Sequence, residues 1–305
     1  MKMRIRLSFP MLALPVLSLS AAAVAQTPAD PGEEAQQGTV ISVTGQRQQS
    51  QQFVEATEAL TPAPSMGDPL PRFLDALCLK VGGAGIGQAA AIKTMIEQHA
   101  RALDIAIAEE GCTLNAVIVA VADPQNFIDK LLTDQPWLAK ADTRARIDRA
   151  LDQNRPVIAW SNTEVRTVDG RPLQVSSEIG GMSLGDSVPV TRGGPPRRIG
   201  LNHSIALANM IVVIDAARLE GASLRQIADF GAMRLLAPTR KSGWEDTLPP
   251  SILSLLDSSP AAAPIELTDF DAAYLRALYS LPANVQATQL RSQVLRERKH
   301  EMAQR

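Results

Sequence analysis

Two short apolar runs limit the folds open to this chain more than any other feature. They cover 114–122 (LNAVIVAVA) and 205–214 (IALANMIVVI). Each run is apolar on both faces and shorter than an ordinary helix, which is typical of a strand at the centre of a covered sheet. Because such strands need helices on both sides, we expect an α/β fold.

Helical spacing of apolar residues surrounds these two runs. It predicts helices over 89–103, from Phe127 to Leu132, and over 142–153. Ser223 followed by Gln226 is a capping-box pattern, and the helix that it starts ends before Pro238. Thr268 followed by Asp271 repeats this pattern at the start of another helix. We expect the small residues of this helix to pack closely against the strand at 211–214.

Antiparallel pairing is also expected. Residues 156–160 form a predicted strand, and 163–168 and 171–176 are predicted to form a hairpin around Asp169-Gly170. The Gly/Pro-rich stretch 180–196 is predicted to be a long exposed loop. The fold class is therefore α/β (α+β) with a mixed sheet, in one domain over 68–284.

The chain begins with the features of a secretory signal peptide. Residues 1–25 combine a basic start, an apolar run and Ala23-Val24-Ala25 before the expected cut. The Gln- and Pro-rich segment 26–67 is predicted to be a disordered leader, and 285–305 a charged helical tail. We therefore expect a periplasmic or secreted protein, without stable membrane insertion after cleavage.

Charge and cysteine content narrow the functional classes. The net charge is −2 and the expected signal peptide carries only cations, so the remaining chain has no basic excess that would attract nucleic acid. The two cysteines, Cys78 and Cys112, are predicted to form a disulfide, since exported proteins reach an oxidising compartment. Two buried free thiols are the alternative.

A glycine-rich turn at 82–90 offers a nucleotide-binding alternative. Gly85, Gly87 and Ala90 fit G-x-G-x-x-A, and Glu109 or Glu110 follows about twenty residues later. Such a turn can bring backbone amides to a pyrophosphate. The alternative is an ordinary turn into a helix, which we favour because a single glycine fingerprint is weak.

Gly181-Met182-Ser183-Leu184-Gly185 matches the nucleophile elbow of serine hydrolases. The chemistry requires a strand before Ser183, a helix after it and a histidine base, for which His203 is the candidate. The residues that follow do not favour a helix. A solvated Gly/Ser loop is the favoured interpretation, with a periplasmic serine hydrolase as the alternative.

The second half resembles the metal-site half of zincin-like metallopeptidases. An apolar strand precedes the helix LRQIADFGAMRLLAP (224–238), PPSILSLL (249–256) follows, and LTDFDAAYLRALY (267–279) comes last. In that family the helix carries HExxH, followed by a Ser-Ile segment and a Leu-Thr-x-x-Asp helix. The resemblance implies a zincin-like domain.

The zinc ligands of that family are missing. Ala228 and Ala232 fall at the positions of the two histidines, and Asp229 falls at the position of the catalytic glutamate. A methyl group cannot bind zinc. We expect no metal and no cofactor, and we interpret Asp229 as a structural partner of Arg225 one turn earlier, with a relict catalytic acid as the alternative.

The chain also resembles a group of exported Gram-negative proteins with no assigned activity. The shared segments are VTGQR (43–47), QFVEATEALT (52–61), RFLDALC (72–78), GC-x-x-N (111–115) and QIADFGAMRLLA (226–237). This resemblance implies an α/β domain with a disulfide. We therefore expect a non-catalytic binding or structural protein that engages an envelope protein or peptide.

Overall fold

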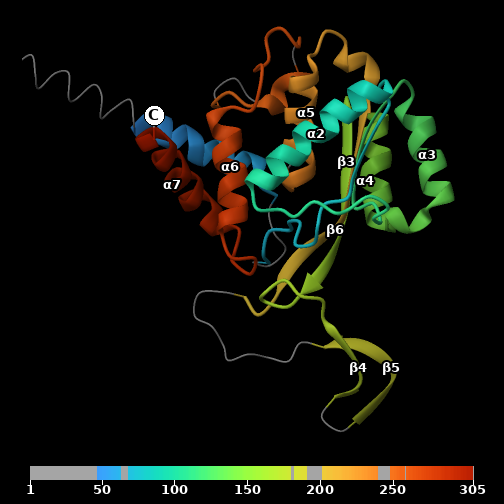
Figure 1. Cartoon of the computed structure of the whole chain (residues 1–305). Helices are drawn as coiled ribbons and strands as arrows, with labels where there is room; N and C mark the ends of the chain where they lie inside the picture. The colour runs from blue at the N-terminus through green and yellow to red at the C-terminus, as the bar shows by residue number, and fades with distance from the viewer. Residues whose placement is uncertain are drawn as a thin grey trace, which may run out of the picture. The chain divides into compact units, whose positions relative to one another are not determined.

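A four-stranded mixed sheet forms the centre of the molecule (Figure 1). The computed structural model describes residues 47–62, 68–179, 182–190, 201–239, 248–257 and 259–304. The sheet order is β1-β2-β6-β3, and its strands are β1 (Leu79–Gly82), β2 (Ala116–Val121), β6 (Ser204–Asp215) and β3 (Val157–Arg166). β1, β2 and β6 are parallel, whereas β3 is antiparallel to β6. The predicted mixed α/β fold is confirmed.

Helices cover both faces of this sheet (Figure 1). One face carries α2 (Ile86–Ala102), α5 (Leu224–Leu236) and α6 (Asp269–Ser280), and the other carries α3 (Pro124–Asp134) and α4 (Ala141–Asp152). The remaining described helices are η2 (Pro136–Leu138), η3 (Ala216–Leu219), η4 (Ile252–Leu256), α7 (Thr288–Gln304) and a helix over 47–60. None of the helices in the described ranges is long and apolar enough to span a membrane.

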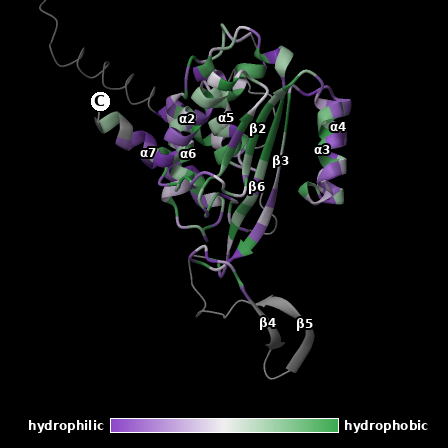
Figure 2. Cartoon of the chain, turned by 45° about the vertical axis from the view of Figure 1, so that its right-hand side comes forward, coloured by the Kyte–Doolittle hydropathy of each residue, from purple (hydrophilic) through white to green (hydrophobic). Residues whose placement is uncertain are grey.

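Alternating side chains of β6 explain why its sequence is apolar at every position from Met210 to Ile214. Val212 and Ile214 pack with the core of the α5 face, whereas Ile211 and Val213 pack with the core of the α3 and α4 face. Successive residues of a strand point to opposite faces, so a strand covered on both sides needs apolar residues at every position. The central strands are accordingly hydrophobic over much of their length (Figure 2).

The predicted disulfide is present. Cys78 and Cys112 are bonded with a Cα–Cα distance of 6.1 Å. The bond joins the residue before β1 to the turn that leads into β2. Asn115 strengthens the same junction, since its side-chain oxygen accepts a hydrogen bond from the Cys78 N–H at 2.8 Å.

Part of the predicted disordered leader is a helix packed in the core. Residues 47–60 are helical, and Phe53, Ala56 and Leu60 are buried. The Phe53 ring meets Phe270 of α6 edge to face, with 5.4 Å between centroids. The prediction of disorder was wrong here because polar glutamines surround a helically spaced apolar stripe. The predicted signal peptide and leader residues 26–46 lie outside the described residues.

Two predictions about the hairpin region need correction. Asp169-Gly170 does form a turn, with Gly170 at φ +82°, but in the described ranges the returning chain makes a single isolated bridge, between Arg166 and Pro172, and no continuous ladder with 163–168. Proline has no N–H to extend the ladder. The chain instead continues into β4 (Gln174–Ile179), which pairs with β5 (Met182–Val190). β5 lies inside the predicted loop 180–196, where alternating apolar residues were the missed strand signal.

The predicted charged tail is helical, but it is not only a surface extension. Leu290 and Val294 of α7 are completely buried in the same core as α6. Their spacing of four residues puts both side chains on one helix face. α7 therefore contributes to the folded core.

Candidate functional site: a groove at the edge of the sheet

A groove of about 360 Å³ runs along the outer edge of β3. Residues 157–161 of β3 form its floor. α4 forms one wall, with Thr143, Arg146 and Ile147, and the other wall comes from the end of α5 and residues 238–239. The groove therefore follows a strand edge between the two helical layers.

The β3 edge is open over this stretch in the described part of the chain. β3 pairs with β6 on its inner side, and no described strand pairs with its outer side over 157–161. Trp160 is buried below the groove and donates a hydrogen bond from Nε1 to the Leu138 carbonyl at 3.0 Å. Ala159 is exposed. The backbone of an edge strand presents N–H and C=O groups that another strand can bind.

Cationic side chains surround the groove. Arg146, Arg155 and Arg234 line it, and none of the described residues that line it is acidic. Among the described acids, Asp142 lies 3.7 Å from Arg146, and the charge of Asp257 acts on Arg234. The sequence did not reveal this cluster, because the three arginines come from different elements.

Arg234 is the most buried of these cations, with 5% of its surface exposed. Its guanidinium lies over the Phe230 ring at 5.4 Å and donates a hydrogen bond from Nη1 to Thr239 Oγ1 at 3.1 Å. Burial lowers the pKa of Arg234 to about 10, against the opposing effect of Asp257. The side chain therefore remains a poorly hydrated cation at neutral pH.

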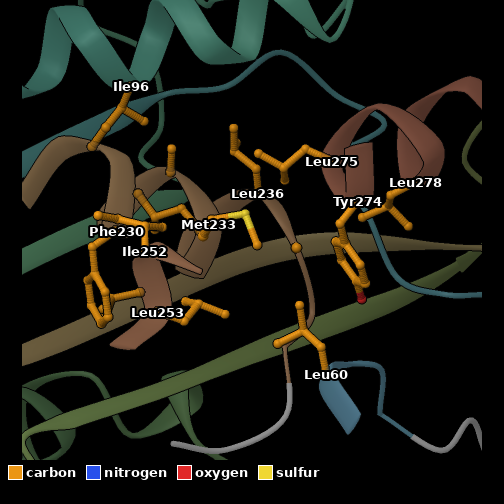
Figure 3. Packing of buried hydrophobic residues seen from close by; sticks show 14 of the residues in the cluster. Leu60, Ile96, Phe230, Met233, Leu236, Ile252, Leu253, Tyr274, Leu275 and Leu278 are labelled. Atoms are coloured by element: carbon orange, nitrogen blue, oxygen red, sulfur yellow. The ribbon is translucent and has the colours of Figure 1, made fainter. Parts of the chain in front are cut away.

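The two positions that the zincin resemblance aligns with zinc-binding histidines are buried inside the protein. Ala228 and Ala232 are completely buried in α5, which packs against α2 and the sheet. Other side chains of α5, including Phe230 and Met233, lie among Ile252, Leu253 and Tyr274 (Figure 3). In the described ranges, no group of three or more His, Cys, Asp or Glu residues is placed to hold a metal ion.

Asp229 has the structural contact predicted for it and two more. Its Oδ2 accepts hydrogen bonds from Arg225 Nε and from the Leu267 N–H, each at 2.8 Å. Its Oδ1 lies 2.6 Å from His99 Nε2. Burial acts to raise the pKa of Asp229, but the hydrogen bonds from His99, Leu267 and Arg225 outweigh it and lower the pKa. The carboxylate is completely buried and fully engaged in joining α2, α5 and residue 267.

The two segments after α5 that carry the zincin resemblance meet at Asp271. This buried carboxylate accepts hydrogen bonds from Ser251 Oγ at 2.5 Å, the Ile252 N–H at 2.8 Å and the Thr268 N–H at 3.0 Å. Burial raises its pKa, while these hydrogen bonds act to lower it. The Ser-Ile segment and the Leu-Thr-x-x-Asp helix are thus clamped together.

The serine-hydrolase residues do not form an elbow. Ser183 lies inside β5, which continues to Val190, so no helix follows the serine. His203 lies just before β6, with Nε2 3.3 Å from Asp68 Oδ1. Gly181 of the motif lies outside the described residues. A nucleophile elbow requires a strand-to-helix turn, so this element of the alternative is wrong.

Packing requires a glycine at the start of this turn, at Gly83, but not at Gly85 or Gly87 of the fingerprint, where a Cβ would meet no backbone atom within 4 Å. Gly83 has φ +82°, and a Cβ on it would lie 1.7 Å from the Ala120 carbonyl oxygen of β2. The turn follows the end of β1, whereas Glu109 and Glu110 precede the start of β2. Because β1 and β2 are parallel, these acids lie at the opposite end of the strands from the turn. They cannot serve as the ribose-binding acid of a dinucleotide site.

Comparisons of the sequence and of the structure with known proteins found no relative of this chain. No family model matches the chain, and no curated protein or solved structure is significantly similar to it.

Proposed function

We propose that this chain is a non-catalytic binding protein that takes an extended peptide segment into the groove along β3. The observation that carries this proposal is the outer edge of β3 at 157–161, which pairs with no strand of the described ranges and forms the floor of a cavity instead of a flat surface. An extended peptide placed there adds a strand to the sheet and gains main-chain hydrogen bonds.

Side chains around the edge support binding of a peptide over self-association of a flat sheet. Ile147, Met210 and Trp160 line the groove and provide apolar contact, while Arg146 and Arg234 stand on its two walls. The groove thus has a wall on each side of the β3 edge. The groove therefore suits a single extended segment of an envelope protein.

A zincin-like frame without zinc remains part of the proposal. It is supported by the order in which β6 leads into α5 and by the clamp of Ser251 and Ile252 on Asp271. The buried methyl groups of Ala228 and Ala232 provide no metal ligands. We therefore propose that the chain has a zincin-like fold but binds peptides without cleaving them.

Export to the periplasm or beyond is likewise proposed. The sequence features of 1–25 and the Cys78–Cys112 disulfide support it, since disulfides persist mainly in oxidising compartments.

Peptide selection from a displayed library of random eight-residue segments tests the proposal, with the chain from residue 26 onward as the target. Selected peptides should slow amide hydrogen exchange at 157–161. Ala159→Trp should abolish binding, because Ala159 is exposed in the groove and a bulky side chain there obstructs it. Thr163→Trp is the matched control, since Thr163 is exposed on the same strand but does not line the groove.

Two outcomes would contradict the proposal. One is a selection that enriches no peptide. The other is a set of selected peptides that bind Ala159→Trp as well as the unmodified protein.

A further inference from the structure

We infer that the β3 groove selects acidic extended segments, and that it reads carboxylates on both faces of the bound strand. This inference rests on the proposed peptide binding and adds the chemical class of the partner. Its basis is the arginines that line the groove, two of which, Arg146 and Arg234, belong to opposite walls.

The arginines belong to opposite sides of the sheet. Arg234 comes from α5, which packs in the core on one face, and Arg146 comes from α4, whose Ile147 packs in the core on the other face. Figure 2 shows α4 and α5 on opposite sides of β3. A strand added beside β3 lies between these two cations.

Side chains of an added strand alternate between the same two sides as those of β3. Val157 packs on the α5 side, whereas Ile158 and Trp160 pack on the α4 side. Successive residues of the bound segment therefore point in turn toward Arg234 and toward Arg146. Two acids at odd spacing, such as i and i+1 or i and i+3, reach both walls, whereas acids at i and i+2 reach only one.

Burial makes the Arg234 wall the stronger site for a carboxylate. Its guanidinium is almost completely removed from water, and a charge-assisted hydrogen bond is stronger in such surroundings than at an exposed surface. Arg146 is largely exposed, so water screens its charge more than the charge of the buried Arg234. Each of the two arginines also has an acid near it, Asp142 at Arg146 and Asp257 at Arg234. A bound carboxylate therefore gains more at Arg234, while Arg146 and Arg155 add attraction that salt weakens.

Synthetic Thr/Val eight-residue peptides provide a direct test by fluorescence anisotropy at low and high salt. One peptide carries two glutamates at i and i+3, the second carries them at i and i+2, and the third has glutamine at both i and i+3. The i, i+3 peptide should bind about tenfold more tightly than the glutamine peptide at low salt. The i, i+2 peptide should fall between them.

Substitutions of exposed or partly exposed arginines test charge recognition without disturbing the core. Arg146→Gln should reduce the i, i+3 peptide to the affinity of the i, i+2 peptide and leave glutamine-peptide binding unchanged. Arg155→Gln should reduce the salt dependence. Arg171→Gln, at an exposed position outside the groove, is the control and should change none of these affinities.

The failures of the two proposals are distinguishable. If glutamate and glutamine peptides bind equally and Ala159→Trp abolishes both, the groove binds peptides but the inference of acid selection is wrong. If the i, i+3 and i, i+2 peptides bind with equal affinity, the inference that arginines on both walls recognise the bound strand is wrong. If none of the three peptides binds, the proposed function itself fails.

Discussion

His99 Nε2 lies 2.6 Å from Asp229 Oδ1, and this contact joins α2 to α5 inside one helical layer. The same carboxylate binds Arg225 on its own helix and the backbone N–H of Leu267. Asp229 is completely buried, whereas His99 and Arg225 are partly exposed. The carboxylate therefore holds α2, α5 and the backbone at residue 267 together.

Asp229→Asn should lower the free energy of unfolding by roughly 2–3 kcal/mol at pH 7. An amide places an N–H₂ group where one of the three donors now binds, and it removes the charge that stabilises His99 and Arg225. Urea unfolding measures the effect. Asp148→Asn is the control, since Asp148 forms an exposed ion pair with Arg144 and should change stability by less than about 1 kcal/mol.

The stability difference between the unmodified protein and Asp229→Asn should depend on pH. Hydrogen bonds lower the pKa of Asp229 in the folded protein, so its stabilising effect is fully present above the unfolded value of about 4. That effect is lost as the pH falls through the lower folded value. The stability difference between the unmodified protein and Asp229→Asn should therefore shrink below about pH 4. An unchanged difference down to pH 2 would contradict this assignment.

Reducing the Cys78–Cys112 bond should destabilise the fold by roughly 3–4 kcal/mol in the chain-entropy model, because the bond closes a loop with a sequence separation of 34. Guanidinium unfolding with and without a reductant gives the difference. The Cys78→Ala/Cys112→Ala double variant should be as stable as the reduced protein and insensitive to reductant. A reductant effect that persists in this variant would show that the loss has another cause.

Ser251→Ala should cost roughly 1–2 kcal/mol, because it removes one donor to the buried Asp271 carboxylate and the cap on the Leu253 N–H. Thr268→Ala, which removes the N-cap of α6, should cost about 1 kcal/mol. Thermal unfolding of the two single variants and the double variant checks both values. Because both side chains bind Asp271, the two effects should not be additive.

Ala232→His should destabilise the protein by roughly 1–3 kcal/mol, since an imidazole overfills a completely buried position. Zinc should not restore the melting temperature, because one imidazole lacks the other ligands. Ala90→His, at an exposed position of α2, is the control. A melting temperature unchanged by Ala232→His would show that this face of α5 is loosely packed.

Sequence patterns identified the strands and helix caps that depend on residues close together in the chain. The run at 114–122 became β2 and the run at 205–214 became β6, since a fully apolar strand needs cover on both faces. The capping boxes at Ser223 and Thr268 were visible because their partners lie three residues apart. The same patterns failed at 47–60, where polar composition masked an apolar stripe.

The sequence by itself determined the α/β class, the central strands, the caps of α5 and α6, and the one possible disulfide between Cys78 and Cys112. Only the tertiary structure decided that His99 lies against Asp229, that β5 pairs with β4, and that Arg146 and Arg234 face one groove. The physical reason is the range of the forces involved. Periodicity and capping act over a few residues, whereas the contacts that build a site join side chains far apart along the chain.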